Sequence, residues 1–251
     1  MSVYFLDTET TDRKPPLEVI EAAWLRVIPD ADADPALIGR QWKFDDWHGR
    51  FKPSLPMTCG AVAVHGILPS ELDGCPPSSD CALPADAQYI IGHSIDFDWQ
   101  AIGSPPVKRI CTHAMSQWVW PDATGYSQSA LIYMLRGMTP ATREILRNAH
   151  GAQVDVNLNA FLLMHILNAV KDPIATWEDL WLFSEECRIP RTSPMRRWEG
   201  VLLEDMETSA IEWCLNLPDL DPYYRKGLER VLSRRYAPQV IDDDPNDELP
   251  F

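Results

Sequence analysis

Short apolar runs separated by polar turns dominate the first part of the chain, and this pattern predicts β-strands. We expect strands at residues 3–6 and 19–28, joined by a polar turn that contains prolines, and a third near residues 47–52. The apolar run at residues 89–91 predicts a further buried strand, while residues 74–84, rich in proline and serine, are typical of a loop. These segments predict the opening of a sheet.

Helical spacing replaces this pattern from about residue 95 onward. The clearest helix is predicted over residues 156–170, where apolar side chains recur every three or four positions. A short apolar piece at residues 107–110 interrupts the helical region. Strands followed mainly by helices, with β/α crossovers, predict a layered α/β domain, which we place at residues 1–173.

Two smaller parts are predicted beyond this domain. Thr176 is expected to cap a helix, and residues 204–216 and 223–235 are amphipathic helix candidates. They predict a small helical C-terminal module at residues 174–238. Residues 239–251 are acidic and are expected to form a disordered tail.

Charge and composition narrow the classes of function. The 251 residues include 37 acids and 22 bases, a formal net charge of -15, which argues against non-specific adhesion to phosphate or to an anionic membrane but leaves a nucleic-acid substrate open. An acidic stretch at residues 30–34 is expected to be a solvated insertion. The six cysteines lack metal-site spacing and predict reduced thiols. We see no targeting signal and no apolar stretch near the roughly 20 residues of a membrane helix, so we expect a soluble, cytoplasmic protein without a membrane partner.

Asp7 and Glu9 are the first candidates for chemistry. They stand two residues apart at the end of the first predicted strand, and a period of two places both side chains on one face of an extended chain. Two carboxylates on one face repel each other unless a positive charge lies between them, and hard divalent cations prefer oxygen ligands. A pair of such ions can bind both the attacking and the leaving oxygen of a phosphodiester. The alternative is a solvated turn, where exposed acids are ordinary.

Two later segments carry similar groups. Asp98 is predicted in the first turn of a helix that follows a strand, at the sheet edge where α/β proteins bind ligands; Asp96 is a competing candidate, and helix-dipole stabilisation is the alternative role. His150 lies on the loop before the long predicted helix, and Asp155 begins that helix. A histidine beside a metal site can take a proton from a water nucleophile, although a lone histidine is more often a surface or capping residue.

Three segments, in this order and spacing, resemble the exonuclease motifs of the DEDDh 3′-to-5′ exonucleases: residues 7–10, 93–98 and 150–155. The resemblance implies an α/β, ribonuclease H-like exonuclease domain, with a mixed sheet flanked by helices. It implies that His150 deprotonates the attacking water. It also implies two Mg²⁺ or Mn²⁺ ions held by four carboxylates, those of Asp7, Glu9, Asp98 and Asp155.

The resemblance extends to substrate contacts. Residues 63–67 resemble the family's His-Gly-Ile segment near the terminal nucleotide, and Glu21 resembles the acid on its second strand. Phe97 is expected either to stack on a base or to pack in the core. The candidate substrate-binding residues are therefore Thr8, Thr11, His65, Gly66 and Phe97.

Within the family, the exodeoxyribonuclease X branch resembles the chain over about residues 1–235. One departure lies at residues 195–200, Met-Arg-Arg-Trp-Glu-Gly, where that branch offers a Phe-Gly-Lys-type basic segment. Arg196, Arg197 and Trp198 remain candidates for a nucleic-acid contact.

The resemblance implies a metal-dependent 3′-to-5′ exonuclease that acts on DNA, preferably single-stranded, and releases 5′-mononucleotides in repair or in degradation of foreign DNA. An exoribonuclease is an alternative, because contacts to the 2′-hydroxyl are not visible in the sequence. A non-catalytic nucleic-acid-binding adaptor that acts through the C-terminal module and tail is another.

The end of the chain has a separate resemblance. Its acids precede Leu249, Pro250 and Phe251, as at the C-terminal tip of bacterial single-stranded DNA-binding proteins. This implies either a protein partner that recognises such a tip or a tail that folds back on the enzyme's own basic surface. A solvated acidic tail is the simpler alternative.

Overall fold

The computed structural model describes residues 1–29, 34–39 and 42–237. It divides the chain into two compact units, Met1–Arg188 and Ile189–Phe251, which are described separately below. Most of the predicted acidic insertion and the whole predicted tail, with its terminal Leu-Pro-Phe, lie outside the described residues.

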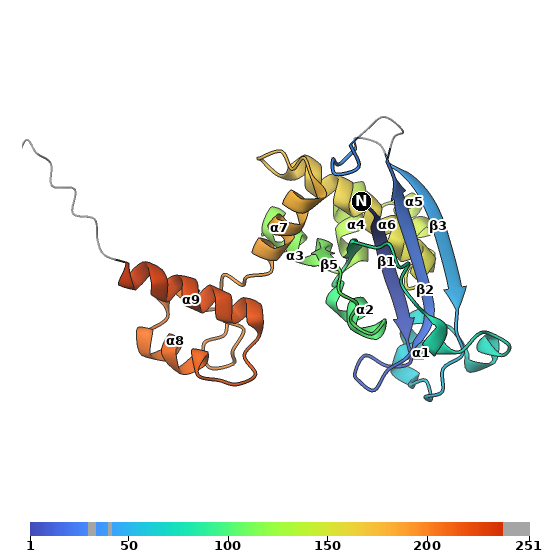
Figure 1. Cartoon of the computed structure of the whole chain (residues 1–251), viewed down its shortest axis with the longest axis horizontal. Helices are drawn as coiled ribbons and strands as arrows, with labels where there is room; N and C mark the ends of the chain where they lie inside the picture. The colour runs from blue at the N-terminus through green and yellow to red at the C-terminus, as the bar shows by residue number, and fades with distance from the viewer. Residues whose placement is uncertain (30–33, 40–41, 238–251) are drawn as a thin grey trace, which may run out of the picture. The chain divides into compact units, whose positions relative to one another are not determined.

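Among the described residues, five strands form one mixed sheet in the order β3-β2-β1-β4-β5 (Figure 1). The strands are β1 (Val3–Thr10), β2 (Val19–Ile28), β3 (Lys43–Arg50), β4 (Tyr89–Gly92) and β5 (Lys108–Cys111). β2 runs antiparallel to both of its neighbours, whereas β1, β4 and β5 are mutually parallel. The carboxyl ends of β1 and β4 therefore open at the same edge of the sheet.

The first strand is longer than the sequence predicts. β1 continues through Thr10 because its polar end is paired: Asp7 lies opposite Ala23 of β2, and Glu9 lies opposite Glu21. β3 likewise begins earlier than predicted. Asp7 and Glu9 are thus held within an extended strand, and the alternative of a solvated turn is excluded.

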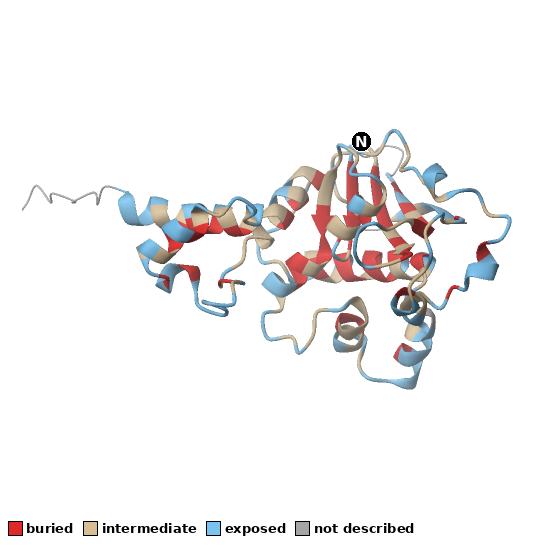
Figure 2. Ribbon diagram, turned by 90° about the horizontal axis from the view of Figure 1, so that it is seen from below, coloured by how far each residue is buried: buried red, intermediate tan, exposed pale blue. Residues whose placement is uncertain are grey.

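Helices cover the sheet in the first unit, and α6 lies across β1 and β2 (Figure 1). Its apolar side chains, such as Leu162 and Ile166, pack with Phe5 and Leu25 of the sheet, and the buried residues concentrate in this layer (Figure 2). The helices of this unit are α1 (Cys59–His65), α2 (Asp96–Ala101), α3 (Thr112–Val119), α4 (Gln128–Arg136), α5 (Pro140–Ile145), α6 (Ala152–Ala169) and α7 (Trp177–Cys187). The described part of this unit also contains the 3₁₀ turns η1 (Pro69–Leu72), η2 (Ser78–Asp80) and η3 (Leu146–Asn148).

The division between the units falls after α7, whereas the sequence places it near residue 173. Thr176 caps α7 as predicted, since its side chain accepts a hydrogen bond from the Asp179 N–H. Trp177 and Leu180 are buried in the main core, so α7 belongs to the first unit. Among the described residues, no helix combines the length and apolar character needed to cross a membrane.

The second unit is a small helical cluster. It contains η4 (Leu203–Asp205), α8 (Thr208–Leu215) and α9 (Pro222–Tyr236), close to the two helices predicted there. Its core is separate, formed by buried side chains that include Ile211, Tyr224 and Leu228.

Candidate active site

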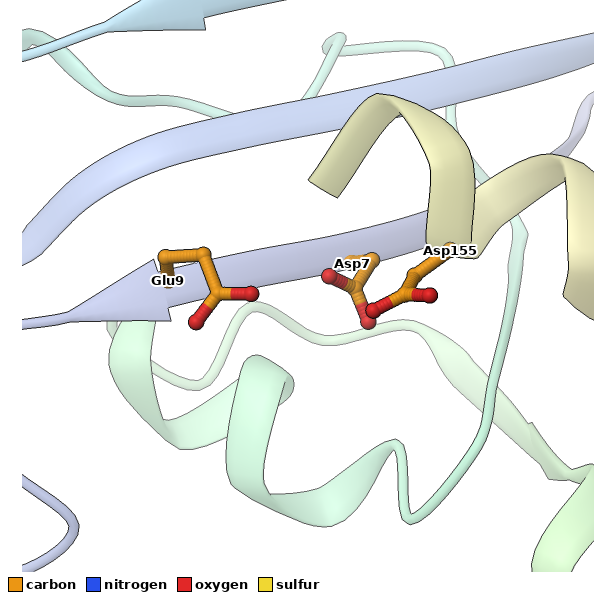
Figure 3. A group of neighbouring side chains, drawn as sticks. All are labelled: Asp7, Glu9 and Asp155. Carbon is orange, nitrogen blue, oxygen red and sulfur yellow. The ribbon is translucent and has the colours of Figure 1, made fainter. Parts of the chain in front are cut away.

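Three carboxylates from two elements converge at the edge of the sheet. Alternate residues of β1 face α6, so Asp7 and Glu9 point to the same side as the core residue Phe5. Asp155 lies in the first turn of α6. Ligand oxygens of Asp7, Glu9 and Asp155 all lie within 4.8 Å of one another, and the side chains face a common centre (Figure 3).

A fourth carboxylate, Asp98, adjoins this cluster from the first turn of α2. Its Oδ1 accepts hydrogen bonds from the Thr8 backbone N–H at 2.8 Å and from the Thr8 hydroxyl at 2.7 Å. Burial raises the pKa of Asp98 to about 7, although the two bonds from Thr8 act to lower it. The competing candidate Asp96 lies apart, bound to Arg109 and Arg188.

The four acids destabilise one another's charge. Burial, followed by the charges of Asp98 and Asp155, raises the pKa of Asp7 well above its usual value. Burial and the charge of Asp155 raise the pKa of Glu9 to about 8. A concentration of negative charge of this kind is relieved either by protons or by a cation.

The donor set suits a hard divalent cation. The group contains only carboxylate oxygens, the ligands preferred by Mg²⁺ and Mn²⁺, and no thiolate or imidazole that would favour a softer metal. Arg13 is the one arginine or lysine among the described residues that line the surrounding cleft. The residues therefore fit bound metal ions of this kind.

His150 reaches the cluster through an unusual backbone conformation. Its φ of 73° is left-handed, and its N–H donates to Asp155 Oδ2 at 3.0 Å. The side chain is exposed and lines the same cleft as the carboxylates. The loop thus places His150 at the cleft that holds Asp155.

Two further residues hold Asp155 in place. Gln128, at the start of α4, donates through Nε2 to Asp155 Oδ1 at 3.2 Å and to the Asp155 carbonyl oxygen at 3.1 Å. Glu21 of β2 accepts a hydrogen bond from the Ala152 N–H at the start of α6, at 3.0 Å. Burial acts to raise the pKa of Glu21, but hydrogen bonds, chiefly from Arg50, keep it below its usual value. Glu21 therefore stays charged and anchors the helix that carries Asp155.

The carboxylates open into a cleft of about 510 Å³, a volume typical of a pocket for a small ligand or a nucleotide. Thr8, His65 and Phe97, three of the candidate substrate-binding residues, line it. Thr11 does not: it is buried, and its hydroxyl accepts a hydrogen bond from the Glu18 N–H. Gly66 ends α1 with a φ of 73° and does not line the cleft either.

Several lining residues were not among the sequence-based candidates: Arg13, His93, His113, Tyr126 and Gln128. His93 joins β4 to the loop before α4, because its Nε2 lies 2.7 Å from the Tyr126 carbonyl oxygen. Burial lowers its pKa to about 4, so it is a neutral structural link at neutral pH. Gln128 lies 27 positions from Asp155 in the chain, and no spacing rule indicated it.

Comparisons with known proteins support the fold. No protein-family model and no curated protein matches the sequence. Among solved structures, Exonuclease X in complex with 5′ overhanging duplex DNA matches 72% of this chain and 99% of its own, with 22% identity and a TM-score of 0.54. The chain has a ribonuclease H-like fold. At this identity the similarity concerns the fold alone.

Two weaker matches are also exonucleases or nucleases by name. E. coli Exonuclease I in complex with a dA16 oligonucleotide matches 76% of this chain and 44% of its own, at 16% identity and a TM-score of 0.48. Cell-death related nuclease 4 matches 66% of this chain and 64% of its own, also at 16% identity and a TM-score of 0.48.

Proposed function

We propose that the protein is a metal-dependent 3′-to-5′ exonuclease that acts on DNA, preferably single-stranded, and releases 5′-mononucleotides. The observation that carries the proposal is the cluster of Asp7, Glu9 and Asp155, whose oxygens lie within 4.8 Å of one another beside His150. The fold shared with Exonuclease X, which was solved with DNA, supports the choice of substrate.

The four carboxylates are assigned to metal binding. Asp7, Glu9 and Asp155 would hold one Mg²⁺ or Mn²⁺ ion, and Asp7 with Asp98 would hold a second. When bound, such ions neutralise the charge that develops on the phosphate and orient the attacking and leaving oxygens in line. The Thr8 hydrogen bonds keep Asp98 turned toward β1, which fixes its position before metal arrives.

The remaining groups act on water and on the nucleotide. His150 accepts one proton of the attacking water, whose oxygen forms a new bond to phosphorus while the phosphorus–O3′ bond breaks. The leaving O3′ takes a proton from solvent and becomes the new 3′-hydroxyl of the shortened strand. Phe97 offers a ring against which a terminal base can stack, and His65 lies near by in the same cleft. Arg13 supplies a positive charge for a substrate phosphate.

Two alternatives follow from the same site. RNA would be a substrate if a lining group, such as the Thr10 side chain, accepted a hydrogen bond from the 2′-hydroxyl. A non-catalytic adaptor would use the cleft only to bind. The complete set of four acids and a histidine favours catalysis, because repelling carboxylates are a cost to a protein that only binds an anionic strand.

The test uses end-labelled DNA and RNA strands of matched sequence, with Mg²⁺, Mn²⁺ or EDTA. We expect stepwise shortening of DNA from the 3′ end, dependent on metal and lost in Asp7→Asn. The matched control is Asp73→Asn, which removes an exposed acid paired with Lys52 outside the cleft. Shortening from the 5′ end, or full activity in Asp7→Asn, contradicts the assignment, and faster turnover of RNA selects the exoribonuclease alternative.

A further inference from the structure

The second unit carries an exposed patch of aromatic and basic side chains, which we call the tryptophan–arginine patch. It consists of Arg196, Arg197, Trp198 and Trp213. Tryptophan and arginine are both enriched at binding surfaces relative to the rest of a protein surface.

The two indole rings are adjacent and accessible. Trp213 projects from α8 with 51% of its surface exposed, while its neighbours Ile211 and Cys214 face the core. The Trp198 ring lies 5.8 Å from the Trp213 ring, centroid to centroid, and packs on the edge of the same core. The unit thus presents an aromatic surface that its own core does not use.

The arginines of the patch are available for a ligand. Arg197 lies over the Trp198 ring at 4.9 Å, and within the described residues neither Arg196 nor Arg197 forms an ion pair with a carboxylate. Arg234 and Arg225 of α9 differ, because Arg234 pairs with Glu204, and Arg225 donates to the carbonyl oxygens of Leu215 and Leu217. Those side chains bind within the unit, whereas Arg196 and Arg197 are exposed.

The loop that carries the patch is held in place. The Ser193 N–H donates to Val201 O at 2.8 Å, and the Gly200 N–H donates back to Ser193 O at 3.0 Å, which closes the loop. The Ser193 hydroxyl is buried and lies 2.8 Å from the Tyr224 hydroxyl, which ties the loop to α9. A closed loop loses little conformational entropy when it binds, so the patch is preorganised.

We propose that the tryptophan–arginine patch binds single-stranded nucleic acid, with bases stacked on Trp213 and Trp198 and phosphates paired with Arg196 and Arg197. Base stacking on aromatic rings tolerates any sequence, and guanidinium groups match phosphate. The inference rests on the proposed function for the identity of the ligand. It gives the enzyme a second contact with its substrate that needs no metal.

The experiment measures binding of the full chain to a labelled 30-nucleotide oligo-dT in EDTA, where no cleavage interferes. Trp213→Ala should weaken affinity about fivefold or more, the effect of losing one stacked base. Arg196→Gln with Arg197→Gln should lower the slope of log affinity against log salt by about 1.4, the value for two phosphate contacts on a single strand. Matched controls are Trp118→Ala and the pair Lys171→Gln with Lys226→Gln, which should change neither quantity.

A second readout separates this inference from the proposed function. Hydrolysis of a single-nucleotide phosphodiester, the p-nitrophenyl ester of thymidine 5′-phosphate, should be unchanged in the patch variants, and their thermal unfolding midpoints should match the unaltered protein. Binding that weakens in the patch variants supports the inference even if no preparation hydrolyses any substrate. Unchanged oligo-dT affinity and salt slope in both patch variants overturn it and leave the patch to a protein partner.

Discussion

The cleft of the first unit and the tryptophan–arginine patch of the second unit would meet the same anionic substrate with opposite charge. The cleft is lined by five acids, the four of the cluster and Asp12, and Arg13 is its only lysine or arginine among the described residues. The patch holds two arginines beside two indole rings. Phosphate is repelled by the bare cleft and attracted by the patch, so metal should be required for chemistry but not for all of the binding.

The two regions differ in the electrostatic cost of their charges. The pKa values of the buried carboxylates are raised by burial and because their negative charges repel one another, and only bound cations or protons relieve this repulsion. The patch has no comparable repulsion between buried charges, because its exposed arginines remain hydrated. The proposed function therefore predicts that metal is needed for cleavage.

Asp7→Asn should separate the chemistry of the cleft from binding at the patch, and it should have the largest effect of the variants considered. The variant should lose activity by ~10³-fold or more, because its carboxylate is shared by the proposed ligand sets. Its affinity for oligo-dT in EDTA should stay within about twofold, since the patch is intact. Single-turnover cleavage and fluorescence anisotropy measure the two quantities. A variant that loses both in parallel would contradict the separation of chemistry from binding.

A smaller effect is expected from Gln128→Ala, which removes the side chain that orients Asp155. Loss of a group that supports a ligand commonly costs about 10–100-fold in activity or metal affinity. The Mg²⁺ concentration for half-maximal activity should rise, while oligo-dT affinity in EDTA stays the same. Gln100→Ala, which alters an exposed glutamine on α2, is the matched control. If the Mg²⁺ requirement is unchanged in Gln128→Ala, Gln128 does not orient a metal ligand.

Much of the sheet and of the carboxylate cluster is predictable from the sequence, because both depend on short-range patterns. The strand at β4 and the place of Asp98 in the first turn of α2 follow from an apolar run and the polar turn after it. The length of β1 does not follow. The apolar run stops at Leu6, and only pairing with β2 extends the strand through Thr10.

The remaining differences are tertiary in origin. Thr11 has the polarity of a substrate contact, but the turn to β2 directs its hydroxyl to the Glu18 N–H. Gln128 reaches Asp155 from another helix, which no local pattern encodes. Trp177 and Leu180 bind α7 to the first core, which moves the division between the units beyond the predicted boundary. Local patterns thus predict which acids gather, but packing decides which neighbours orient them.

The smallest effect is expected in the pH dependence of the free energy of unfolding, which distinguishes the cleft from the patch without any substrate. The pKa of Glu9 rises from 4.5 to about 8 on folding, so between these pH values the folded protein binds more protons than the unfolded chain. The free energy of unfolding in EDTA should therefore fall as pH increases from about 4.5 to 8. Urea unfolding across this range should show the decline, and saturating Mg²⁺ should flatten it because the ions replace the protons. In EDTA, the free energy of unfolding of Glu9→Gln should change less with pH than that of the unaltered protein. The double variant Arg196→Gln with Arg197→Gln should keep the full pH dependence. Stability in EDTA that rises over this range would mean that the carboxylates are already neutralised by groups of the protein itself, and the cleft would then have no need of a metal.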